Sequence, residues 1–198
     1  MAKKESTFLN MVLTLVIVAA AASFTLATVY NLTKEPIERA REAARQAAIS
    51  MVLPAFDELV TLSFMPVTGS EPLEFNLGFK DNEMVGVAVA TYTNMGYSGV
   101  IRAMVGFDTD GRIIDVVHLS HTETPGLGDK IEKGKSDWSD QFIGFDPGTA
   151  NLSVRKDGGD VDAITAATIT ARAYADAIDR AWQTFMANRE TVLKEGGE

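Results

Sequence analysis

An uninterrupted apolar segment lies near the N-terminus. No side chain between Ser6 and Thr33 is charged, and Phe8–Tyr30 is rich in Leu, Val, Ile and Ala. About 20 apolar residues in a helix cross the hydrocarbon core of a bilayer, so the pattern predicts a membrane anchor. The alternative is a cleaved signal peptide, because residues 19–22 are small enough for a cleavage site. However, the apolar run continues past them, unlike the short core of a signal peptide.

A helical pattern follows the anchor. Pro36 suits the first turn of a helix, and apolar residues recur at helical spacing to about Leu53, just before Pro54. We therefore expect a stalk or docking helix that joins the membrane to the domain. The expected parts of the chain are the N-terminus and anchor at 1–33, the stalk helix at 34–56 and one domain at 57–198.

The middle of the chain has the composition of β-strands. Residues 84–93 contain Val, Ala and Tyr, and residues 99–107 contain Val, Ala and Ile, a composition typical of strands. A third such segment, 112–119, follows a strong turn signal at 108–111. The second and third segments therefore predict a hairpin. The stretch that follows contains many Gly and Pro residues, and its length suggests a binding loop.

The C-terminal part has a helical period from about Thr168 to Asn188. Its apolar residues recur every four positions, at Ile169, Ala173, Ala177, Ala181 and Phe185. A run of strands followed by a terminal helix predicts an α+β fold, with an antiparallel sheet and a C-terminal helix.

Composition narrows the possible chemistry. The net charge of −9 argues against nucleic acid as a partner and suits partners with basic faces. The chain has no cysteine, which excludes disulfides and cysteine-ligated iron–sulfur clusters. A redox protein of this composition needs an organic cofactor, or a few His and carboxylate ligands. Lys and Arg residues flank the anchor on both sides, so charge alone leaves its orientation open.

Small and hydroxyl-bearing residues precede the C-terminal helix, in the order Asp162-Ala163-Ile164-Thr165-Ala166-Ala167-Thr168. Free N–H groups and the helix dipole attract anions at a helix N-terminus, so this position suits a phosphate. The two adjacent alanines would let a bulky ligand approach the backbone. A simple helix cap, made by Thr165 or a nearby hydroxyl, is the alternative.

A second segment, HTETPGLGDKI at 121–131, has an unusual content of Pro and Gly. Such a loop exposes backbone N–H and C=O groups that can approach a flat ring. Leu127 offers an apolar contact and Thr124 a hydrogen bond. The alternative is a surface turn in which Glu123 and Lys130 are solvated charges.

Other polar and aromatic residues carry weaker signals. His118 and His121 are three positions apart, and on a strand such positions face opposite sides, so no metal site is expected. Asp108 and Asp110 fit a turn better than a calcium loop. The aromatic rings of Tyr97 and Trp138 are candidates for stacking on a planar cofactor, and equally for the core or for partner contacts.

The two motifs together resemble a known family. DAITAAT is similar to the flavinylation motif of the FMN-binding domain family, with Ala166 where glycine is often found. The segment around ETPGLG resembles the G subunit of the Rnf complex, and also the C subunit of the sodium-translocating NADH:quinone reductase. In this family the last hydroxyl of the motif, here Thr168, receives FMN as a phosphodiester from a magnesium-dependent transferase that consumes FAD.

The resemblance implies a set of FMN-binding residues and no catalytic acid, base or nucleophile. This set comprises Asp162, Thr165, Ala166, Ala167, Thr168 and Thr170, together with Glu123, Thr124, Pro125, Gly126, Leu127, Gly128 and Lys130.

The resemblance also implies a role and a location. The role is that of an electron-carrying subunit of a ferredoxin:NAD oxidoreductase that exports sodium ions or protons. Its partners would be the membrane and iron–sulfur subunits of the Rnf complex and the flavin transferase. The domain would lie on the extracytoplasmic side of the inner membrane. The C subunit of the quinone reductase, or another flavinylated carrier, is the nearer alternative. A non-redox anchored interaction module is the more distant one.

Overall fold

The computed structural model describes residues 7–195, and the chain divides into two compact units at Ala44/Arg45. In the first unit the only described element is the helix α1 (Phe8–Val52), whose side chains are exposed from Phe8 to Ala44. Among the described residues, α1 is the one helix that is long and apolar enough to cross a membrane. The predicted apolar helix near the N-terminus is thus confirmed.

The predicted anchor and stalk segments lie in one helix, because α1 is continuous and Pro36 lies inside it. Proline lacks the N–H that would bond to the carbonyl four residues earlier, but the turns on either side continue. An ion pair between Glu35 and Arg39, at 2.5 Å and four residues apart, spans the proline and supports these turns.

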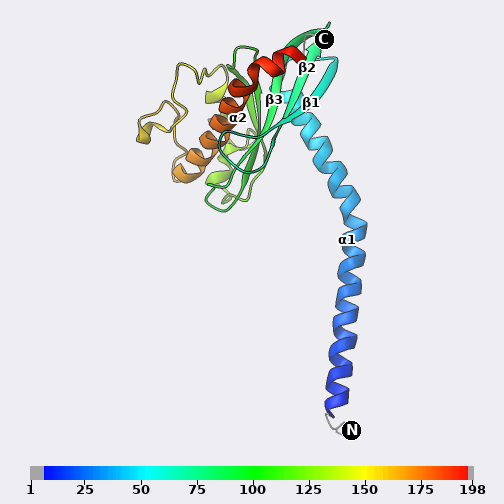
Figure 1. The fold of residues 1–198 in the computed structure, drawn as a ribbon. Coiled ribbons are helices and arrows are strands. Elements are labelled where there is room, and N and C mark those ends of the chain that lie inside the picture. Colours follow the sequence, from blue (N-terminus) through cyan, green and yellow to red (C-terminus); the bar gives the residue numbers. More distant parts are fainter. Residues whose placement is uncertain (1–6, 196–198) are drawn as a thin grey trace. The chain divides into compact units, whose positions relative to one another are not determined.

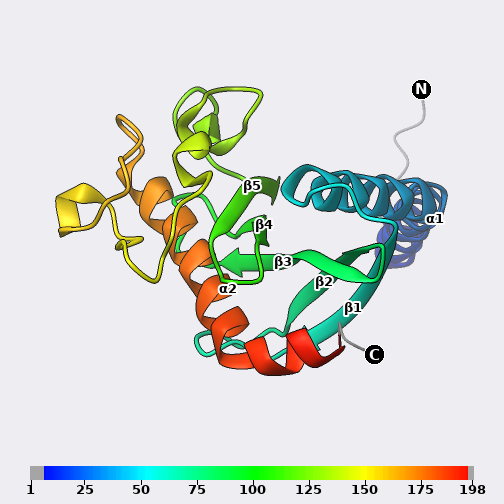
Figure 2. The ribbon, with the colours of Figure 1, turned by 90° about the horizontal axis from the view of Figure 1, so that it is seen from above.

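The second unit is built on one five-stranded antiparallel sheet whose strands follow chain order (Figures 1 and 2). The predicted strands and the α+β fold are confirmed. Two further strands at the start of the sheet were not predicted. The strands are β1 (Glu58–Phe64), β2 (Leu73–Lys80), β3 (Glu83–Thr93), β4 (Ile101–Phe107) and β5 (Ile113–Ser120).

The C-terminal helix α2 (Thr168–Glu195) packs against β3 and β4 on one face of the sheet (Figure 2). The main core lies between them, where Phe107 stacks on Phe185 with ring centroids 5.5 Å apart. The buried hydroxyl of Thr91 donates to the Ala177 carbonyl at 2.8 Å, which fixes the helix along the strand. Apolar periodicity in α2 is therefore explained by burial against the sheet.

The last turns of α1 cover the opposite face of the sheet. Ile49 and Val52 are fully buried there against Ala88 and Met104. Gly106 on β4 makes this contact possible, because a Cβ on it would overlap the Val52 carbonyl. The unit is thus a three-layer arrangement of helix, sheet and helix.

The long segment between β5 and α2 is folded onto the core and is not an open loop. It contains three short 3-10 helices, η1 (Gly128–Ile131), η2 (Trp138–Phe142) and η3 (Arg155–Asp157). Ile131 and Phe142 are fully buried in the main core. Ile131 lies in the first motif, and Ile164 in the second motif is also buried in this core, so both motifs are held against it.

We predict that Gly106→Ala lowers the free energy of unfolding by about 1–3 kcal/mol, as is typical of overpacking. The added methyl would push the end of α1 away from β4. Urea unfolding of the full chain in detergent, followed by the fluorescence of Trp138 and Trp182, measures the change. Gly134→Ala is the matched control, because no atom lies within 4 Å of the added Cβ. Equal stability of the two variants would contradict the proposed close contact.

Candidate functional site

A cavity of about 500 Å³ lies between the segment after β5 and the start of α2. This volume is within the usual range of small-molecule sites. Eight of the residues expected to bind a cofactor line it, together with Tyr97 and Ile169. The eight are Glu123, Thr124, Leu127, Gly128, Ala166, Ala167, Thr168 and Thr170.

The first wall of the cavity is a tight turn closed on one carbonyl. The Thr124 carbonyl accepts the N–H groups of Leu127, at 3.2 Å, and Gly128, at 3.0 Å. Gly126 has a φ of +78°, which glycine adopts without strain, and its N–H lowers the pKa of the Asp129 carboxyl. The turn points Pro125 and Gly126 into solvent, and they do not line the cavity.

A buried carboxylate joins this turn to the rest of the site. Glu123, only 5% exposed, accepts the Ser98 N–H at 2.9 Å and a short hydrogen bond from the Thr170 hydroxyl. A Cβ on Gly128 would lie 2.8 Å from the Glu123 Cβ and 3.0 Å from the Thr170 hydroxyl. Only glycine at position 128 lets the turn approach Glu123 and Thr170 this closely. The segments that contain Ser98, Glu123 and Thr170 therefore meet at one carboxylate.

The second wall is the first turn of α2. Its first intrahelical bond runs from the Ala171 N–H to the Ala167 carbonyl, at 3.1 Å, so Ala167 and not Thr165 occupies the N-cap position. Alanine has no side-chain acceptor, and helix geometry gives the N–H groups of residues 168–170 no intrahelical partner. The half-buried Thr168 side chain lines the cavity at this end, whereas Thr165 is exposed outside it.

Ala166 precedes this turn with a φ of +65°, in the left-handed region. A residue with a Cβ pays a conformational penalty in this region, which glycine does not. Glycine at this position in the motif therefore has a conformational explanation. Here alanine adopts the same backbone at some cost in stability.

Two other predicted residues lie outside the cavity. Asp162 pairs with Arg155 at 2.8 Å, and its carbonyl accepts the indole N–H of Trp138 at 2.7 Å. Lys130 is half-buried in η1. Trp138 packs on Tyr174, with ring centroids 5.7 Å apart, so it belongs to the core and not to the cavity.

Ile169 lines the cavity but was expected in the apolar ridge of α2. It is 48% exposed, whereas the ridge residues that follow it are buried against the sheet. The first turn of α2 faces the segment after β5, so the helical period does not indicate what Ile169 contacts. Its place at the cavity depends on a contact between segments that are distant along the chain, and no local pattern signals such a contact.

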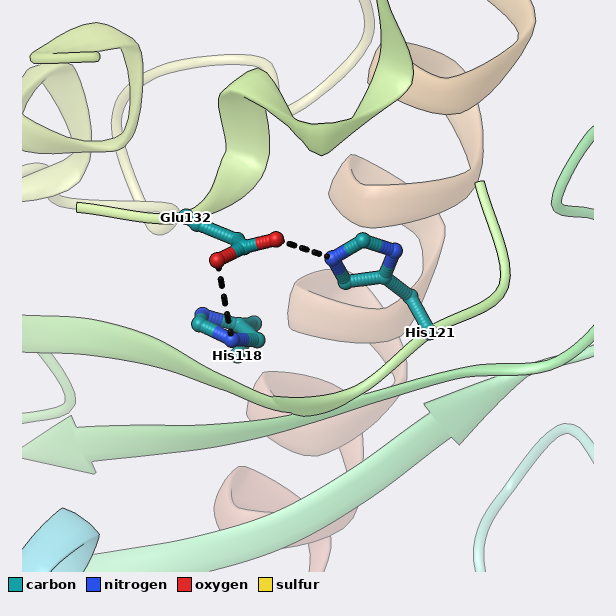
Figure 3. A group of neighbouring side chains, drawn as sticks. All are labelled: His118, His121 and Glu132. Atoms are coloured by element: carbon teal, nitrogen blue, oxygen red, sulfur yellow. Dashed lines mark hydrogen bonds and ion pairs between the residues drawn. The ribbon is translucent and has the colours of Figure 1, made fainter. Parts of the chain in front are cut away.

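The expectation that His118 and His121 face opposite sides is also wrong. β5 ends at Ser120, so the period-two rule no longer applies to His121. The two rings lie 5.5 Å apart, and both approach the carboxylate of Glu132 (Figure 3). Burial lowers the pKa of His118, and nearby His121 acts in the same direction, while Glu132 opposes them.

We predict that Ala166→Val lowers the free energy of unfolding by about 1–2 kcal/mol, because a β-branched side chain fits the left-handed region poorly. Ala166→Gly is the matched control. Its relief of strain offsets the greater entropy of an unfolded glycine, so its stability should equal or exceed that of the parent chain. Urea unfolding measures both. A stable Val variant would contradict the positive φ.

Comparison with known proteins agrees with this geometry. Residues 96–183 match the model of the FMN-binding domain, a range that contains both cavity walls. The G subunit of the ion-translocating oxidoreductase complex of Vibrio atlanticus is 33% identical over 200 residues, covering 94% of this chain and 96% of the relative.

Two further relatives are also G subunits of ion-translocating oxidoreductase complexes. The G subunit from Erwinia tasmaniensis is 36% identical over 177 residues, with 84% of each chain covered. That from Cereibacter sphaeroides is 48% identical over 104 residues, or 51% of this chain and 48% of the relative. The resemblance found in the two motifs is confirmed, and the chain belongs to the family of G subunits of ion-translocating oxidoreductase complexes.

Proposed function

We propose that this chain is an electron-carrying subunit of an ion-translocating oxidoreductase complex, and that it holds one FMN in the cavity between residues 123–128 and α2. The main support is that this cavity is formed by the two motifs and lies within the FMN-binding domain match. FMN supplies one- and two-electron redox chemistry when bound.

The residues of the cavity fit this cofactor. The uncapped start of α2 suits a phosphate, because its free N–H groups and dipole favour an anion. Leu127 and Ile169, 41% and 48% exposed, offer apolar surface for a flat ring, and Tyr97 adds an aromatic side chain. The protein binds and orients the cofactor, and no residue acts as an acid or base.

We further propose that the FMN phosphate is esterified to Thr168. Of the three hydroxyl residues near the start of α2, Thr165 lies outside the cavity and Thr170 is buried and bonded to Glu123. Thr168 is half-buried and lines the cavity, so its hydroxyl suits the role of acceptor. The Thr168 oxygen would bond to the flavin-side phosphorus of FAD. The pyrophosphate bond would break, AMP would leave, and the hydroxyl proton would be lost to solvent.

The partners follow from the family. The relatives named above support assembly in a multi-subunit oxidoreductase complex, and we propose that the complex is of the ferredoxin:NAD type. The iron–sulfur and membrane subunits of such a complex would exchange electrons with the flavin. α1 would cross the inner membrane once, with the domain on the extracytoplasmic side, and a flavin transferase there would attach the FMN.

We predict that Thr168→Val abolishes covalent FMN, because it removes the acceptor oxygen and nearly conserves side-chain volume. The full chain would be co-expressed with the transferase, and flavin fluorescence on a denaturing gel and peptide mass measured. Thr165→Val is the matched control and should retain FMN at the level of the parent chain. An FMN-bearing peptide modified at Thr165 or Thr170 would overturn the assignment.

We predict that Leu127→Ala leaves the attachment intact and increases the access of solvent to the flavin. The smaller side chain removes an apolar contact at the cavity wall, which is expected to change the absorption spectrum of the flavin as well. Quenching of flavin fluorescence by iodide should therefore become stronger. Ile143→Ala, at an exposed residue outside the cavity, is the control and should have no effect. Loss of attachment in the Leu127 variant would mean that the turn organises Thr168 itself.

A further inference from the structure

Three side chains outside the cavity converge beside its first wall. His118 comes from β5, His121 follows β5, and Glu132 follows η1 (Figure 3). One carboxylate oxygen of Glu132 is 3.0 Å from Nε2 of His121, and the other is 3.9 Å from Nε2 of His118. One potential ligand atom from each side chain lies within 4.8 Å of the other two.

We propose that His118, His121 and Glu132 bind a divalent cation of the zinc class, and that its occupancy is coupled to the flavin cavity through Glu123. The site does not rest on the proposed function, because none of the three residues lines the cavity.

The ligand set selects the cation. Two imidazoles and one carboxylate suit zinc and related transition metals, whereas magnesium and calcium require oxygen ligands. Ligand atoms around tetrahedral zinc lie about 3.3–3.6 Å apart, since each is about 2.0–2.2 Å from the metal. One ligand atom from each of the three side chains lies within 4.8 Å of the others, so each spacing has to shorten by at most about 1.5 Å. Three protein ligands leave a fourth position for water.

His118 has the character of a ligand without its metal. Its Nε2 lies 3.9 Å from the Glu132 carboxylate, which is too far for a hydrogen bond, so this nitrogen can take a metal without losing one to Glu132. The neighbouring cation does not compete for Glu132, because Lys133 pairs with Asp115 at 2.6 Å and Asp140 at 3.2 Å.

The coupling follows from the tautomer of His121. Its Nδ1 accepts the Glu123 backbone N–H at 3.1 Å, so in the neutral ring the proton lies on Nε2 and is donated to Glu132. A metal on Nε2 displaces that proton, and the other nitrogen of a metal-bound neutral imidazole is a donor. The metal and the bond from Glu123 therefore exclude each other. Loss of one such hydrogen bond costs about tenfold in metal affinity.

The test uses the full chain in detergent, without a histidine tag and without the transferase, so that no FMN is attached. Zn²⁺ is titrated in competition with a chromophoric chelator, and Co²⁺ serves as a spectroscopic replacement. We expect one Zn²⁺ per chain and visible Co²⁺ bands of a site with nitrogen and oxygen ligands. Absence of saturable binding, or equal competition by Mg²⁺, would overturn the proposal.

Ligand variants identify the site. His118→Gln, His121→Asn and Glu132→Gln should each weaken Zn²⁺ binding by at least about tenfold. Glu83→Gln, at an exposed carboxylate on β3, is the matched control and should bind as the parent chain does. The near-isosteric Glu132→Gln keeps the test valid where a histidine variant fails to fold. Undiminished binding in Glu132→Gln would contradict the assignment.

Amide hydrogen exchange tests the coupling separately. Zn²⁺ should speed exchange at the Glu123 amide, because that N–H loses its acceptor. The Val116 amide on β5, which donates to the Asp115 carboxylate, is the internal control and should not change. Zn²⁺ binding with unaltered exchange at Glu123 would show that the two sites are independent.

Discussion

Three separate segments of the chain meet at the carboxylate of Glu123, which accepts hydrogen bonds from the Ser98 backbone and the Thr170 hydroxyl. A carboxylate that is only 5% exposed is costly unless both oxygens are bonded, so these partners must stay in place. The position of the turn at 124–128 relative to α2 follows from this requirement. It also explains Gly128, since no Cβ fits between the carboxylate and the helix. The hydrogen bonds of Glu123 thus fix the relative position of the two walls between which the cavity lies.

Much of the fold could be predicted from the sequence because its strongest signals are local. Apolar alternation and the turn at 108–111 predicted β4 and β5, and the helical period predicted α2. β2 was missed because a buried Asn76 and a bulge at Gly78 interrupt its apolar pattern. The continuity of α1 through Pro36 was missed because a proline ends most helices but not all. In both cases the surrounding structure outweighs a local preference.

The site was predictable only as far as a motif specifies position along the chain. Thr168 and Leu127 were expected to bind the cofactor, and both side chains line the cavity. Pro125 does not, because the turn that brings Leu127 inward points its own tip into solvent. The position of Ile169 at the cavity depends on where α2 begins relative to other segments. In the same way, the contact between His118 and His121 depends on where β5 ends. Element boundaries of this kind are set by tertiary packing, which periodicity does not encode.

The absence of cysteine constrains how electrons would pass through such a protein. The chain supplies no thiolate for an iron–sulfur cluster, and both of its histidines lie in the cluster with Glu132. A single FMN would therefore receive and release every electron through the same cavity. Leu127, Ile169 and Tyr97 are each more than 40% exposed along the cavity wall, so the ring edge would remain within reach of a partner there. A cofactor that is accessible in this way would be held weakly by burial alone, so the proposed covalent attachment at Thr168 would retain the flavin while leaving its reactive edge open.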